Sequence, residues 1–184
     1  FAASAAGAAT MDFVFDNANS TIDVTNNPTG CIFGSCPLNA QILTPFSSLS
    51  LAQGESATFN FALFTIGNGL GFGSADLDAT LAFTVPTAGP ASTSGNGSYF
   101  HTNAFWVFPS PTSGSLTWAD PLQTFTTSDG SVFSVQFNDL KGFKVGDSVY
   151  DSVTITADSI AASVPEPGVW AMLIAGLGMI GAAL

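Results

Sequence analysis

The chain has 184 residues, of which 13 are acidic and only two, Lys141 and Lys144, are basic, so the formal net charge is −11. This charge argues against nucleic acid as a partner, because phosphate binding needs clustered Lys and Arg. Hydrophobic residues make up 46% of the chain and include 17 phenylalanines, which is enough to bury a core. We therefore expect a single folded domain of ordinary size.

The first nine residues read FAASAAGAA and are almost all small. Small residues at alternate positions are typical of the region before a signal-peptide cleavage site, and the alternative is a flexible arm. On either interpretation, we expect the folded domain to begin near Thr10 and to run to residue 163.

Apolar residues recur at every second position in five segments of this domain, and such alternation predicts strands with one buried face. The residues expected to point inward are Met11, Phe13, Phe15, Phe59, Phe61, Leu63, Leu81, Phe83, Val85, Phe133, Val135, Phe137, Val149, Val153 and Ile155. Turn clusters separate the segments, and Asp129-Gly130 predicts a tight hairpin. The fold class that we predict is all-β, an antiparallel β-sandwich of about 8–10 short strands.

Hard oxygen ligands, which calcium prefers, occur in two segments of the predicted sandwich. Asp16, Asn19 and Asp23 belong to the first segment, and Asp76 and Asp78 belong to the second. These residues are the candidate ligands of a calcium ion, and we expect no other cofactor. Asp and Asn also form local turns with their own backbone, which is the alternative interpretation.

Two tryptophans, Trp106 and Trp118, belong to an aromatic cluster that would stack against sugars if it were exposed. The alternative, which we favour, is that these rings lie in the core. His101 is the only histidine, and no Gly-x-Ser-x-Gly motif accompanies it. We therefore do not expect the chain to be an enzyme.

Residues 169–184 read VWAMLIAGLGMIGAAL and carry no charge. As a helix they would span roughly 24 Å, which is shorter than a bilayer core of about 30 Å and also fits a buried helix. The segment is apolar on all sides and contains Gly176, Gly178 and Gly181, which favours a helix made for a membrane. We expect one hydrophobic helix here, after the β-sandwich.

The segment before this helix carries a specific motif. Val164, Pro165, Glu166 and Pro167, followed by Trp170, resemble the PEP-CTERM sorting signal of Gram-negative bacteria, which combines a Pro-Glu-Pro motif, a short membrane helix and a terminal Arg cluster. The resemblance covers residues 164–184, which contain no arginine. It implies sorting by an exosortase-type membrane enzyme, export through the inner membrane, and a final location outside the cell or on its surface.

Cys31 and Cys36 are the only cysteines. In an exported chain, a pair without an odd thiol is expected to form a disulfide, and the alternatives are a redox pair or half of a zinc site. The spacing differs from the two-residue spacing of redox motifs, and His101 is distant in sequence. We therefore predict a structural disulfide that holds a loop between early strands.

Together these patterns favour an exported structural protein of the cell surface or extracellular matrix. The alternative is a surface adhesin or carbohydrate-binding module with extracellular polysaccharide as its partner, and the third hypothesis is a secreted hydrolase. We also expect self-association by strand addition, because the predicted strands at 56–66 and 132–138 carry no charge to guard an edge. A non-closing contact of this kind builds a filament.

Overall fold

The computed structural model describes residues 9–27, 29–34, 37–67, 70–101, 113–143 and 148–161. These residues form strands and no helix, so none of them provides a helix that could cross a bilayer. The strands are β1 (Thr10–Phe15), β2 (Thr21–Asn26), β3 (Thr29–Phe33), β4 (Leu38–Ile42), β5 (Leu49–Ala52), β6 (Ser56–Ile66), β7 (Leu70–Leu81), β8 (Phe83–Val85), β9 (Ala91–His101), β10 (Ser113–Trp118), β11 (Leu122–Thr126), β12 (Val132–Phe137), β13 (Leu140–Phe143) and β14 (Ser148–Ser159).

The prediction of an all-β, antiparallel fold is confirmed, because every strand pair is antiparallel. The predicted number of strands was too low, since the described residues contain fourteen. The additional strands are short. β5 and β8, for example, have four and three residues, too few to give a clear alternating pattern.

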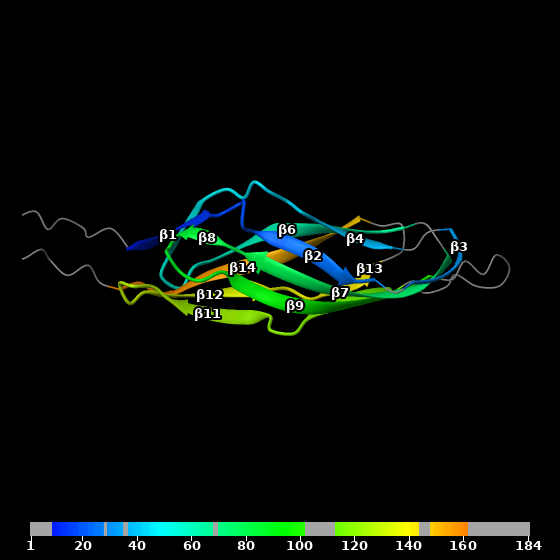
Figure 1. Ribbon diagram of the computed structural model, residues 1–184. Coiled ribbons are helices and arrows are strands. Elements are labelled where there is room, and N and C mark those ends of the chain that lie inside the picture. The colour runs from blue at the N-terminus through cyan, green and yellow to red at the C-terminus, as the bar shows by residue number, and fades with distance from the viewer. Residues whose placement is uncertain are drawn as a thin grey trace, which may run out of the picture.

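Three sheets build a sandwich-like arrangement, in which the two larger sheets form the layers (Figure 1). The β14 sheet has five strands in the order β11-β12-β14-β6-β4. The β9 sheet has six strands, in the order β13-β10-β9-β7-β2 with β3 also paired to β7. The β1 sheet has three strands, in the order β5-β1-β8.

Aromatic rings connect the three sheets in one hydrophobic core. Phe133 and Phe137 of β12 are fully buried, as their alternation predicts. Phe13 of β1 meets Phe133 with ring centroids 5.3 Å apart, and Trp118 of β10 meets Phe137 at 5.6 Å. Such aromatic pairs bury large areas and favour tilted or edge contacts, so they fix how the sheets stack.

A bulge in β6 reverses the predicted alternation. Phe61 and Ala62 are adjacent and both fully buried, and the pairing of β6 with β14 shifts register at this point. An extra residue in one strand moves every later side chain to the other face. Beyond the bulge, Phe64 and Ile66 are therefore buried, and the prediction that Leu63 points inward was wrong.

The predicted strand through residues 81–85 is divided between two sheets. Leu81 ends β7 and Phe83 begins β8, while the carbonyl of Ala82 between them accepts a hydrogen bond of 2.9 Å from the Asp16 amide. Phe83 is still buried as predicted, but the pairing of β1 with β8 shifts register between Phe83 and Val85, and the alternation ends there. Val85 is 44% exposed, which corrects the prediction that it points inward.

The hairpin predicted at Asp129-Gly130 is confirmed and joins β11 to β12. The Thr127 amide donates to the Ser131 carbonyl at 2.9 Å, and Gly130 adopts a φ of 88°, which a residue without a side chain tolerates best. The Asp129 carboxylate accepts hydrogen bonds from Thr127 and Ser131, and these bonds lower its pKa, with the Thr127 hydroxyl as the largest cause.

The described chain starts and ends at the same end of the sandwich (Figure 1). Thr10 at the start of β1 pairs with Ala52, and Ser159 at the end of β14 pairs with Val132 beside the β11–β12 turn. Thr10 and Ile160 also line one depression. Residue 161, the last residue that the structure describes, therefore lies near this end of the sandwich.

Candidate functional site

Several predicted site residues lie outside the residues that the structure describes. They are Cys36, Trp106, the sorting-motif residues Val164, Pro165, Glu166, Pro167 and Trp170, and the helix predicted at 169–184. Cys31 lies in β3, but its disulfide partner is among these residues. The disulfide and the sorting signal therefore remain predictions.

Asp16 and Asn19, two candidate calcium ligands, form a local turn between β1 and β2. Asp16 Oδ1 accepts hydrogen bonds from the backbone amides of Ala18 and Asn19, both at 3.2 Å, and its Oδ2 accepts one from Asn19 Nδ2 at 2.6 Å. These bonds, with the Asn19 side chain first, lower the pKa of Asp16 although the carboxylate is exposed. The arrangement is the Asx turn that the sequence left as an alternative.

The other three candidate ligands lie on the outer face of the β9 sheet. Asp23 of β2 stands directly opposite Asp78 of β7, and Asp76 lies two residues before Asp78 on the same exposed face. Asn96 of β9 donates to Asp76 Oδ1 at 2.8 Å. No three acidic, His or Cys side chains of the described residues are close enough to hold a metal ion, so these candidates do not form one cluster.

Trp118, a candidate sugar-binding residue, lies in the core with only 3% of its surface exposed. Its ring lies against Gly95 of β9, where a Cβ atom would come within 2.6 Å of the indole Cε3. The lack of a side chain at Gly95 thus makes room for the ring. Trp118 fills the interior and is not an exposed platform, which corrects its place among the candidate ligand aromatics.

A buried acidic residue that the sequence analysis did not single out lies close to Trp118. Asp151 of β14 is fully buried, and its Oδ1 accepts a hydrogen bond of 2.9 Å from the Ser152 amide. Its Oδ2 and the indole Nε1 of Trp118 are the two buried side-chain polar atoms of the described residues that make no hydrogen bond of normal geometry. An unsatisfied buried polar atom is costly, so the two atoms call for a structural explanation.

Burial is the largest influence on Asp151 and raises its pKa to about 7. The Ser152 amide and the Trp118 indole oppose this change, whereas the negative charge of Asp139 adds to it. Asp139 is held close to Trp118, because its Oδ1 accepts a hydrogen bond of 3.1 Å from the Trp118 backbone amide. Asp151 is thus an acid that changes charge near neutral pH, but it is closed off from solvent and from any substrate.

One sequence signal would have identified Asp151. Val149, Val153 and Ile155 were predicted to point inward, and position 151 has the same phase in that strand. An acidic residue at an inward position of an otherwise apolar strand indicates a buried charge or a buried carboxylic acid.

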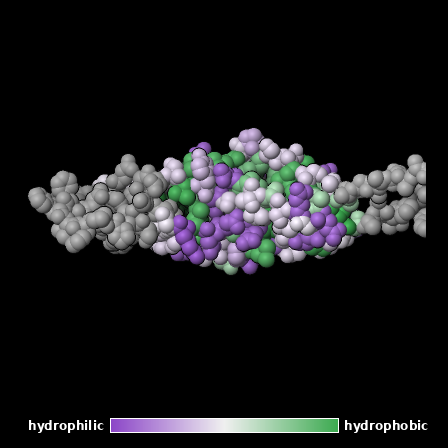
Figure 2. All heavy atoms as spheres, turned by 180° about the vertical axis from the view of Figure 1, so that it is seen from behind, coloured by the Kyte–Doolittle hydropathy of each residue, from purple (hydrophilic) through white to green (hydrophobic). Residues whose placement is uncertain are grey.

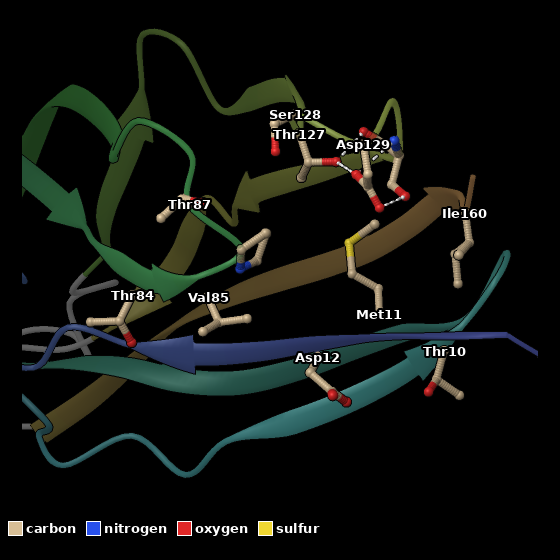
Figure 3. A pocket seen from close by; sticks show the side chains of 12 residues that line it. Thr10, Met11, Asp12, Thr84, Val85, Thr87, Thr127, Ser128, Asp129 and Ile160 are labelled. Carbon is tan, nitrogen blue, oxygen red and sulfur yellow. Dashed lines mark hydrogen bonds between the residues drawn. The ribbon is translucent and has the colours of Figure 1, made fainter. Parts of the chain in front are cut away.

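A surface depression of about 400 Å³ lies at the end of the sandwich where the described chain starts and ends (Figure 3). Met11 of β1, Val85 of β8 and Asp129 of the hairpin turn are among its lining residues. Figure 3 shows Met11 between the β1 strand and this turn. Its lining is mostly Thr, Ser and Asp, and the Asp129 oxygens already accept hydrogen bonds from their own turn.

Comparison with known proteins adds no assignment, because no family model, no curated protein and no solved structure matches this chain. Its function must therefore be argued from its own residues.

Proposed function

We propose that this chain is an exported structural protein of the cell surface or extracellular matrix, sorted through residues 164–184 by an exosortase-type membrane enzyme. The observation that carries the proposal is the Pro165-Glu166-Pro167 motif followed by an uncharged apolar segment. This combination fits a sorting and membrane segment better than it fits an enzyme, a nucleic-acid-binding protein or a cytosolic binding domain.

The geometry of the β-domain supports this proposal. β14 is a central strand of its sheet and ends at Ser159, only a few residues before the motif. The core of the described residues is made by strands from all three sheets and is rich in fully buried rings. A domain of this kind can fold before the residues that follow it are processed.

We further propose that the protein associates with copies of itself. Structural surface proteins act as assemblies, and an exposed sheet edge offers backbone groups for this purpose. The charge of −11 on each copy opposes association. Assembly should accordingly strengthen as ionic strength rises.

The sorting proposal is tested in a Gram-negative host that carries an exosortase-type enzyme. The variant replaces Pro165, Glu166 and Pro167 with alanine, and the matched control is Ser163→Ala, just outside the motif. We expect the wild type and the control to reach the surface or medium with a shortened C-terminus, whereas the motif variant stays unprocessed in the inner membrane. Equal processing and location of all three proteins would refute the proposal.

A further inference from the structure

Of the two strands first expected to be open edges, β12 is an interior strand and β6 is interior over its second half. β12 lies between β11 and β14, and residues 62–66 of β6 lie between β14 and β4, so these backbone groups are paired on two sides, whereas residues 56–60 of β6 pair with β14 alone. The expectation of an open edge was therefore wrong for the segment at 132–138 and for residues 62–66, but not for residues 56–60. The edge of the β14 sheet beside β12 is instead β11, Leu122–Thr126, which pairs with β12 alone.

The hydrogen bonds at both ends of the β11–β12 pair fix which backbone groups of β11 point outward. The Phe137 amide donates to the Pro121 carbonyl at 2.7 Å, and the Thr127 amide donates to the Ser131 carbonyl at 2.9 Å. In an antiparallel pair, bonded residues alternate along each strand. The residues bonded to β12 are thus odd-numbered, and the amides and carbonyls of Leu122, Thr124 and Thr126 point away from the sheet.

At two other edges, amide side chains cover outward backbone groups. At the other edge of the β14 sheet, Asn27 Nδ2 donates to the Leu38 carbonyl of β4 at 3.0 Å, and Asn27 Oδ1 lies 3.5 Å from the Leu38 amide. Where β9 extends beyond β10, Gln123 donates to the Ser92 carbonyl at 2.6 Å and accepts from the Ser92 amide at 3.2 Å. The β13 edge carries an exposed charge, Lys141.

β11 has no protection of these kinds. The sequence Leu-Gln-Thr-Phe-Thr contains no charge and no proline, and its outward amides have no hydrogen-bond partner among the described residues. Leu122 is 57% exposed, although it is a large apolar side chain. Figure 2 shows further hydrophobic residues scattered between polar ones on the face seen from behind. An edge with these properties is suited to pairing with another uncharged strand.

We infer that β11 pairs antiparallel with β11 of a second copy about a twofold axis at Thr124, which joins two β14 sheets into one. The inference rests on the self-association in the proposed function and names its surface. In this register, Leu122 pairs with Thr126 of the second copy, Thr124 pairs with itself, and every outward group finds a partner.

The flanking charges favour a second copy in this register. Asp120 precedes β11 and Asp129 follows it, so an offset strand would bring carboxylates toward one another. With Thr124 on the axis, Asp120 lies opposite Ser128 of the second copy, and no two acids face each other directly. A twofold contact uses the same surface on both copies and therefore closes. The structure thus favours a dimer over the filament expected from the sequence.

The test measures self-association of the full 184-residue chain by sedimentation equilibrium, up to protein concentrations on the order of 1 mM because small interfaces bind weakly. Thr124→Lys and Thr124→Glu are studied alone and as an equimolar mixture. Each alone places like charges opposite each other on the axis, which should raise the dissociation constant by about tenfold or more, whereas the mixture should restore dimers. Thr117→Lys, exposed in the doubly paired strand β10, is the control and should dimerise like the wild type.

A second variant, Thr124→Pro, removes one outward amide that takes no part in pairing with β12, so it should abolish the dimer while the unfolding transition persists. Three results would overturn the inference: a wild type that stays monomeric, homodimers that persist in both charge variants, or a mixture that fails to restore them. A larger polymer that forms equally well in the wild type and in the Thr124 variants would also overturn it. That result would still support the self-association in the proposed function.

Discussion

Asp151 and Trp118 come from opposite sheets and bring a carboxyl oxygen and an indole N–H, both without a hydrogen bond of normal geometry, into the same part of the core. The two groups are complementary, since one accepts and the other donates. Their burial makes the protonation of Asp151 a property of the folded state, with consequences for stability.

The first prediction concerns pH. Because the pKa of Asp151 is raised from 3.8 to about 7 in the folded protein, the folded state keeps a proton that the unfolded chain releases. The free energy of unfolding should therefore fall by about 1.4 kcal/mol per unit as the pH rises between these two values, by about 4 kcal/mol at most, and then level off. Denaturant unfolding at a series of pH values measures this slope.

Asp151→Asn is the control for that measurement, because its side chain has a similar shape but does not titrate. The difference between wild type and variant cancels the contributions of the acidic groups that do not interact with Asp151. A difference that stays constant from pH 4 to pH 8 would show that Asp151 is not a buried, titrating acid.

The second prediction concerns the space beside Trp118. In Gly95→Ala, the new Cβ would lie 2.6 Å and 2.8 Å from two carbon atoms of the indole ring, so the ring must shift. We expect a loss of about 1–3 kcal/mol. Gly97→Ala is the matched control in the same strand, because its Cβ would meet nothing closer than 3.6 Å. Equal stabilities of the two variants in thermal unfolding would contradict this packing.

The third prediction concerns Asp23 and Asp78, which face each other across β2 and β7. Like charges in this position repel, so Asp23→Asn should stabilise the fold by about 0.2–1 kcal/mol, and salt should reduce the gain. The control is Asp12→Asn in β1, where Asp12 lies opposite Ser50 of β5, and it should change the stability little.

Millimolar calcium should raise the melting temperature of the wild type more than that of Asp23→Asn, since a divalent cation offsets the repulsion between Asp23 and Asp78. Equal increases in the two proteins would argue against calcium at this pair.

Alternation predicted the fold where a strand is regular. Phe133, Val135 and Phe137 point inward as expected, and the turn at Asp129-Gly130 joins two paired strands. Alternation failed at Leu63 and Val85, because register shifts in the β6–β14 and β1–β8 pairs interrupt it without a local sequence signal. These features depend on how distant strands pair.

The candidate site was less predictable for the same reason. Asp23 and Asp78 are distant in sequence and become neighbours only through the pairing of β2 with β7. Whether a strand is an edge also depends on the order of strands in its sheet, which is why β11 was missed. Asp151, in contrast, could have been found from its inward phase.

The central claim is that residues 164–184 form a sorting signal outside the β-domain. Thermal unfolding of the chain that ends at residue 163 tests this most directly. We predict one cooperative transition close to that of the full chain, because the strands already complete a core. Loss of cooperative unfolding in the truncated protein would mean that the C-terminal segment belongs to the core, and it would contradict the sorting interpretation.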